Sequence, residues 1–133
     1  MVIVPAAAVL VAGFVQVVLA APSGKVREEN RAALERKMLG TWKGQTGCAG
    51  SFLFRADGTY ELTGYGPAPY ESAGTWNVRG DTLPATLVLT CTTSEVLDDV
   101  GVTREVMLIR LGDGSLAVKH ANEMVELYAR LRK

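Results

Sequence analysis

The residues that could do chemistry are few, and they are spread along the chain. His120 is the only histidine, and its alternation with Leu116 and Val118 would let it face an interior near a strand end. A metal site there would have to recruit distant carboxylates, because no second histidine or cysteine lies near it. Asp98 and Asp99 lack the spacing of a calcium loop. No catalytic pair, triad or phosphate-binding loop is recognisable, so we expect no enzyme activity, no metal and no cofactor.

Aromatic side chains form the group best suited to binding. Phe52, Phe54, Tyr60 and Trp76 fall at positions that would place them on one face of neighbouring predicted strands. They could fill a packed core, or they could line an apolar pocket in which the Tyr60 hydroxyl meets the polar end of a ligand. The sequence leaves both interpretations open, because filled and hollow interiors use the same residue types. We keep all four as candidate ligand-binding residues.

Cys48 and Cys91 are the only cysteines in the chain. In an oxidising compartment they would form one structural disulfide, and closing a loop of this length would stabilise the fold by about 4 kcal/mol. Two unpaired buried thiols are the alternative. Their wide separation excludes the geometry of CxxC redox motifs and zinc knuckles. A nucleophilic thiol would need an activating base, and His120 is the only histidine that could act as one.

The first 22 residues differ sharply in composition from the rest. They include 18 apolar residues and no charge, whereas all 14 basic and all 14 acidic residues follow them. Residues 1–21 are typical of a secretory signal peptide, with small-residue cleavage sites at Val18-Leu19-Ala20 and at Leu19-Ala20-Ala21, although no basic residue precedes the apolar run. We therefore expect a secreted or periplasmic protein. The alternative is a retained N-terminal anchor, which would be its one membrane contact.

Behind this leader the sequence predicts one helix and then a series of strands. Residues 22–39 form a linker and a short helix, which Ser23 can cap and Gly40 ends. Residues 40–133 form one β domain of short runs with period two, separated by turn signals such as Asp57-Gly58. The predicted strands lie near residues 41–48, 50–56, 59–66, 71–79, 82–92, 102–112, 115–121 and 124–131. Short connections imply an antiparallel up-and-down meander, and eight strands suffice to close it into a barrel.

Alternation along the predicted strands defines an inner face for this barrel. It places Trp42 and both cysteines inward, while Arg104, Glu105 and Arg110 are expected on the outer face. The other expected inner residues are Phe52, Phe54, Tyr60, Leu62, Trp76, Val78, Leu87, Leu89, Met107, Ile109, Leu116, Val118, Val125, Leu127 and Leu131. A register error of one residue would reverse any of these assignments.

Several short motifs resemble those of lipocalin-like proteins. The segment Met38-Leu39-Gly40-Thr41-Trp42-Lys43 is similar to the G-x-W opening of lipocalins and fatty-acid-binding proteins. The Asp57-Gly58 hairpin, followed by Gly74-Thr75-Trp76, resembles bacterial lipocalin-like domains. The resemblance covers most of residues 38–131 and implies a mainly β, eight-stranded lipocalin-like barrel. It also implies that Trp42 stacks with a basic side chain near the last strand, either Arg130 or Arg132, and so closes the barrel floor.

Charge and resemblance together set the functional expectation. The net charge is zero, which argues against nucleic-acid binding, because proteins of that class show a basic excess. The resemblance implies an exported protein that binds a small apolar or amphipathic ligand inside the barrel. The body is shorter than a full lipocalin, so the cavity could be small or filled. The alternative is a filled barrel that acts as an envelope protein-interaction or inhibitor-like module through residues 64–71 and 94–101.

Overall fold

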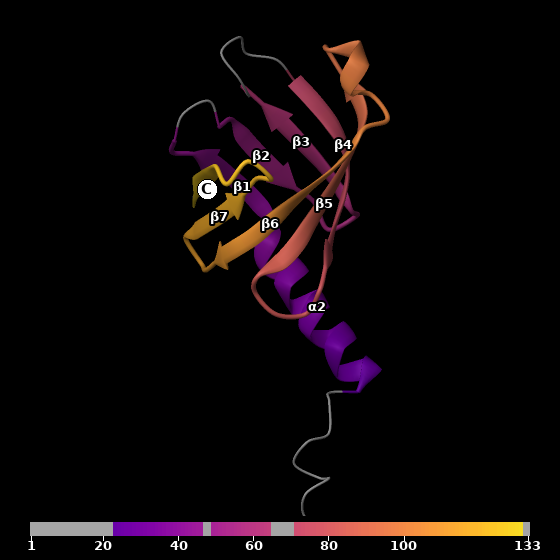
Figure 1. The fold of residues 1–133 in the computed structure, drawn as a ribbon, viewed down its shortest axis with the longest axis vertical. Coiled ribbons are helices and arrows are strands. Elements are labelled where there is room, and N and C mark those ends of the chain that lie inside the picture. Colours follow the sequence, from indigo (N-terminus) through magenta and orange to yellow (C-terminus); the bar gives the residue numbers. More distant parts are fainter. Residues whose placement is uncertain (1–22, 47–48, 65–70, 132–133) are drawn as a thin grey trace, which may run out of the picture.

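A computed structural model describes residues 23–46, 49–64 and 71–131 (Figure 1). One α-helix precedes a run of strands in this part of the chain, and the strands close into an antiparallel barrel. The predicted fold class is therefore confirmed. The expected signal peptide lies outside the described residues. Among the described helices, none is both long enough and apolar enough to cross a bilayer.

The barrel of the described residues is built from eight strands, each hydrogen-bonded to the next in sequence, with the last pairing back onto the first. The strands are β1 (Gly40–Gly44), β2 (Ser51–Phe54), β3 (Thr59–Thr63), β4 (Glu71–Arg79), β5 (Ala85–Ser94), β6 (Thr103–Leu111), β7 (Ser115–Lys119) and β8 (Val125–Arg130). A short 3-10 helix, η1 (Leu97–Asp99), lies in the connection between β5 and β6. All the strand positions predicted from alternation and turn signals have a counterpart, because the tight turns punctuate the chain clearly.

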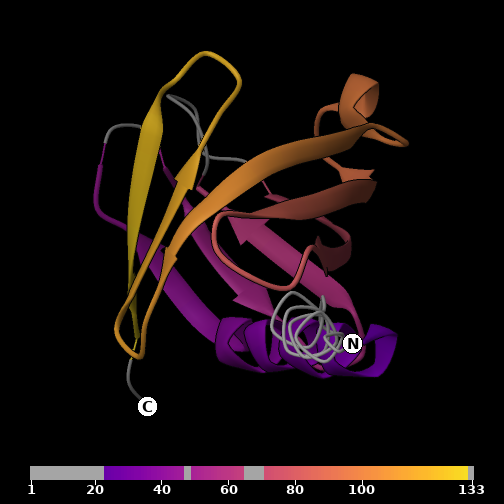
Figure 2. The same ribbon diagram turned by 60° about the horizontal axis from the view of Figure 1, so that its bottom comes forward.

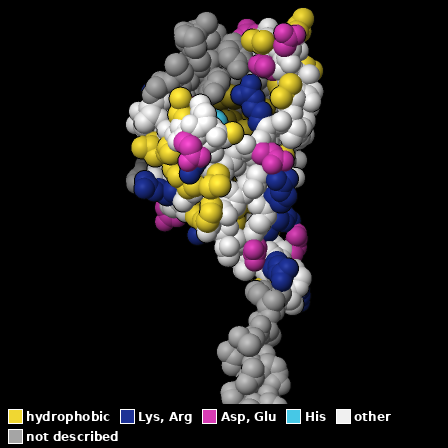
Figure 3. Space-filling model, viewed as in Figure 1, with side chains coloured by type: hydrophobic (Ala, Val, Ile, Leu, Met, Phe, Trp, Pro, Cys, Tyr) yellow, Lys and Arg dark blue, Asp and Glu magenta, His cyan; other side chains and the backbone are white. Residues whose placement is uncertain are grey.

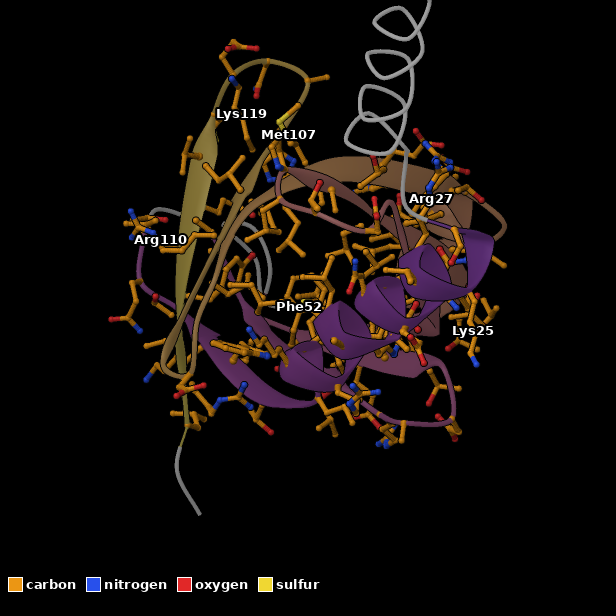
Figure 4. The ribbon with its side chains drawn as sticks, turned by 90° about the horizontal axis from the view of Figure 1, so that it is seen from below. Lys25, Arg27, Phe52, Met107, Arg110 and Lys119 are labelled. Carbon is orange, nitrogen blue, oxygen red and sulfur yellow. The ribbon has the colours of Figure 1, made fainter. Side chains whose placement is uncertain are left out.

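The helix α2 (Gly24–Met38) closes one end of the barrel. Its first turn is capped by the Ser23 hydroxyl, which accepts a hydrogen bond from the Val26 amide at 3.2 Å. Near its other end, the Glu35 carboxylate accepts a hydrogen bond from the Val78 amide of β4 at 2.9 Å. Viewed with this end forward or from below, α2 lies across the ring of strands (Figures 2 and 4). We call this the closed end, and the opposite end, with the β5–β6 and β7–β8 connections, the open end.

Packing of the inner face follows the predicted alternation in the first half of the barrel and departs from it in the second. The expected inner residues of β2 to β5 are all buried. On β6 and β8 the assignment is wrong by one residue. Five residues expected inside are exposed, namely Met107, Ile109, Val125, Leu127 and Leu131. Their buried neighbours are instead Val106, Leu108, Leu111, Glu126 and Tyr128.

The physical reason for the error differs between these two strands. On β6, the run Val106-Met107-Leu108-Ile109 is apolar at both parities, and the pairing with β7 shifts register between Leu108 and Arg110. Alternation cannot specify a face in such a run. On β8, the inward positions are occupied by a charged residue and a tyrosine, Glu126 and Tyr128, so the apolar parity points outward. The charged residue inside the barrel, Glu126, lines the interior cavity.

Candidate ligand-binding site

Trp42, which is fully buried, anchors the closed end. Its indole N–H donates to the Met38 carbonyl oxygen at the end of α2 (2.8 Å). The guanidinium carbon of Arg130 lies 4.2 Å from the centroid of the indole ring, so the stacking implied by the resemblance is made by this arginine. Arg132 lies outside the described residues. Gly40 adopts a φ of +114°, and an added Cβ would lie 2.9 Å from the Arg130 guanidinium, which explains why glycine precedes the tryptophan.

Arg130 also satisfies the backbone around it. Its guanidinium donates to the carbonyl oxygens of Asp113 at 2.7 Å, Leu39 at 2.6 Å and Lys37 at 2.7 Å. These three acceptors belong to the β6–β7 turn and to the end of α2. One side chain therefore ties β8 to the helix and to a neighbouring turn, which is a structural role.

The predicted aromatic set divides between the two halves of the barrel. The rings of Phe52 and Phe54 are stacked, with centroids 4.9 Å apart, and Phe54 meets Trp76 edge to face at 5.2 Å. The Trp76 indole N–H donates to the Arg55 carbonyl oxygen at 3.1 Å. Phe54 and Trp76 belong to the packed core and do not line the interior cavity, so their candidacy as ligand-binding residues is not supported. Phe52 and Tyr60 do line it.

The interior cavity lies in the open half of the barrel and has a volume of about 60 Å³. Its wall is mostly apolar, with polar groups at a few places. The lining residues are Phe52, Tyr60, Leu62, Ser72, Leu87, Leu89, Cys91, Asp99, Val102, Arg104, Val106, Leu116, Val118, His120 and Glu126. The molecular surface shows a hollow in which hydrophobic side chains and a histidine side chain are visible (Figure 3). The labelled Phe52 lies inside the ring of strands, whereas Arg110 and Lys119 lie outside it (Figure 4).

Three polar side chains meet at the cavity wall. Oε1 of Glu126 accepts a hydrogen bond from the Tyr128 hydroxyl at 2.9 Å, and it lies 2.9 Å from Nε2 of His120. Glu126 is only 7% exposed, and Tyr128 2%. The sequence allowed His120 to face the interior near a strand end, and it lies in the cavity wall within hydrogen-bond distance of Glu126. Sequence reasoning missed Glu126 and Tyr128, and the available signal was a glutamate flanked by apolar residues on both sides in a short strand.

A second polar pair lies at the rim of the cavity. Nη2 of Arg104 is 3.7 Å from Oδ1 of Asp99, which belongs to η1. Arg104 was expected on the outer face, and this is wrong because it shares parity with the buried Val106 and Leu108. Both members are more exposed than Glu126, so water screens their charges. The rim is thus mixed in charge, whereas the described interior contains one carboxylate.

Cys91 is buried and carries a free thiol, which donates to the Thr93 carbonyl oxygen at 3.3 Å. The structure therefore shows no disulfide at Cys91, and Cys48, its expected partner, lies outside the described residues. In the described part of the chain, no group of three or more histidine, cysteine, aspartate or glutamate residues is arranged to hold a metal ion. Within the described residues, the cavity offers a ligand apolar contact, one buried acceptor group and a rim of mixed charge.

Comparison of the chain with known protein families, with curated protein sequences and with solved structures finds no match. The closed barrel does not by itself identify a family, since one fold serves many unrelated functions. Membership of the lipocalin-like proteins therefore stays a prediction based on the motifs around Trp42 and Trp76.

Proposed function

We propose that the protein binds a small amphipathic molecule in the open half of its barrel. The observation that supports this is the cavity of about 60 Å³, whose apolar wall is interrupted by the His120–Glu126–Tyr128 cluster. An apolar wall favours the hydrocarbon part of a ligand, and a few fixed polar groups orient its head. A barrel filled by side chains along its whole length would leave no such space.

The size of the cavity limits the ligand. An engineered apolar protein cavity of about 150 Å³ binds benzene, whereas this one is about 60 Å³. The enclosed part of the ligand should therefore be smaller than a benzene ring, for instance a short alkyl chain. A longer molecule would have to extend past the rim at Arg104 and Asp99. Fatty acids of ordinary chain length do not fit the cavity as it stands.

Two further expectations belong to this proposal and rest on the sequence alone. Residues 1–21 would direct export, so that the barrel acts outside the cytoplasm in a secreted or periplasmic form. A relationship to lipocalin-like proteins would be consistent with ligand binding inside the barrel. Neither expectation is needed for the binding test.

The test is ligand binding by a variant whose cavity is filled. Val118 lies in the cavity wall and is 4% exposed, so Val118→Phe should fill the space and abolish binding. Val125 on the adjacent strand faces outward, 41% exposed, and Val125→Phe is the matched control that should bind as the original protein does. Titration with 1-butanol, followed by the chemical shifts of cavity-wall methyl groups, measures binding, and circular dichroism checks folding. Equal binding by both variants would contradict the proposal.

A second candidate function, a protein-interaction module, is favoured by the β5–β6 connection. Leu97 of η1 is 83% exposed, and Val96 and Val100 beside it are 43% and 44% exposed. An apolar tip of this kind suits contact with another protein. The companion loop expected from the sequence, residues 64–71, lies mostly outside the described residues. A partner that the original protein retains from an envelope fraction, and that Leu97→Glu does not, would support this function; equal retention by both would count against it.

A further inference from the structure

The Glu126 carboxylate carries more information about the ligand than the apolar wall does. It is the one charged side chain buried in the described part of the chain. A buried carboxylate is costly unless hydrogen bonds or a cation compensate the loss of hydration. The contacts of its two oxygens therefore indicate which partner the site leaves to a ligand.

The two oxygens of Glu126 differ in their contacts. Oε1 receives the Tyr128 hydroxyl and lies within hydrogen-bond distance of His120. Oε2 makes no hydrogen bond or ion pair with any described residue. Glu126 lines the cavity, so we take Oε2 as the oxygen that a ligand there would meet.

Among the described residues, no lysine or arginine pairs with Glu126 to neutralise its charge, so a cationic ligand could do so. The arginine of the cavity lining, Arg104, is paired with Asp99 at the rim. His120 contacts Oε1 and does not occupy Oε2. An ionised carboxylate oxygen only accepts hydrogen bonds, so the complementary ligand group must donate one.

We propose that the ligand of this cavity is a small aliphatic amine, bound as its ammonium ion. Its N–H groups donate to Oε2 of Glu126, and its alkyl chain lies along Leu89, Val106 and Val118. This inference rests on the proposed binding function and narrows it. An alcohol of the same length would make a weaker, uncharged donation, and a carboxylic acid would bring a second negative charge against Glu126.

Three probes with the same four-carbon chain test the inference, namely n-butylammonium, 1-butanol and butyrate. Titration followed by chemical shifts of cavity-wall methyl groups gives the three dissociation constants. We expect n-butylammonium to bind about 10-fold or more tightly than 1-butanol, because charge-assisted hydrogen bonds are stronger than neutral ones. Butyrate should bind most weakly. Equal binding of the amine and the alcohol, or a preference for butyrate, would overturn the amine inference and leave the proposed function standing.

Absence of binding by all three probes would instead remove the proposed function itself, so the two failures are distinct. The variant Glu126→Gln should keep its affinity for 1-butanol and lose the preference for n-butylammonium. Glu61→Gln, on the outer face of β3 with a half-exposed side chain, is the control and should keep the preference. If Glu126→Gln still prefers n-butylammonium over 1-butanol, a group other than Glu126 causes the preference. If Glu126→Gln does not fold, the three dissociation constants measured on the original protein still test whether the cavity prefers an amine.

Discussion

The closed end of the barrel brings together a tryptophan, an arginine and a helix terminus, whereas the open end brings together a glutamate, a histidine and a tyrosine around a cavity. At the closed end, the guanidinium of Arg130 has three carbonyl partners and an indole face. At the open end, one oxygen of Glu126 has two partners and the other has none among the described residues. The hydrogen bonds of Arg130 are made within the protein and stabilise the fold. The Glu126 oxygen without a described partner is the atom to which a ligand can donate a hydrogen bond.

Packing makes the same distinction. Trp42, Phe54, Trp76 and Val78 are buried and lie outside the cavity lining, whereas Leu89, Val106 and Val118 are buried against free space. Enlarging a side chain of the packed group must displace its neighbours. Enlarging a side chain of the cavity wall places the added atoms in free space. The predictions below test this contrast, beginning with the largest expected effect.

Removal of the Trp42 side chain should produce the largest loss of stability. Trp42→Ala leaves a cavity under α2, an unused carbonyl at Met38 and an arginine with nothing to stack on. The free energy of unfolding should fall by about 3–5 kcal/mol, as measured by urea denaturation. A loss below about 1 kcal/mol would mean that the closed end is not the anchor of the fold.

Arg130 should tolerate no conservative replacement. Arg130→Lys keeps the charge but cannot reach three carbonyl oxygens from one planar group, so we expect a loss of about 1–3 kcal/mol in the free energy of unfolding. Arg110→Lys, on the outer face of β6, is the matched control and should change stability by less than about 0.5 kcal/mol. Equal effects in urea denaturation would show that the stacking and carbonyl contacts add nothing.

Two identical enlargements compare the halves of the barrel directly. Val78→Leu, at the packed end, should cost about 1–3 kcal/mol because the core there is full. Val118→Leu, in the cavity wall, should change stability by less than about 1 kcal/mol, since the added methylene enters free space. Both valines are almost fully buried, at 2% and 4% exposure, so burial alone does not distinguish them. A cost at Val118 that matches the cost at Val78 would argue for a filled barrel.

The smallest expected effect concerns Asp57 in the β2–β3 turn at the closed end. Its carboxylate accepts hydrogen bonds from the Thr59 hydroxyl at 2.6 Å and the Thr59 amide at 3.0 Å, and these lower the pKa of Asp57. A lowered pKa contributes stability above the unfolded-state value, and that contribution is lost as the pH falls through the folded-state value. Asp57→Asn should therefore flatten the acid limb of the stability profile slightly. An unchanged slope between neutral and acid pH would contradict this.

Much of the fold could be predicted from the sequence, because turn residues and alternation act locally. Asp57-Gly58 and the apolar alternation of β2 to β5 specify both the hairpin and its inner face. The closed end was expected from the resemblance of Gly40-x-Trp42 to lipocalin-like proteins, and the positive φ of Gly40 supplies a physical reason for the glycine. The candidate site was harder to predict. Glu126 faces inward against its own strand's apolar pattern, and only the pairing of β7 with β8 shows that it does.

The faces of β6 could not be predicted for a related reason. In a run that is apolar at four successive positions, alternation does not show which side faces the core; the pairing with neighbouring strands decides it. The register shift between Leu108 and Arg110 also changes which positions face inward within the strand. On β6, Met107 and Ile109 are the apolar residues that face outward. Figure 3 shows hydrophobic side chains on the surface over β6 and β7.

Xenon binding tests the central claim, a hollow open half above a packed closed half, most directly because xenon enters apolar cavities without needing a polar partner. Methyl carbon–proton spectra recorded at increasing xenon pressure would report each valine and leucine separately. We predict saturable shifts at the methyl groups of Leu89, Val106 and Val118, which line the cavity, and none at Val78 or Leu111. Absence of any shift in the open half, or equal shifts in both halves, would contradict the account.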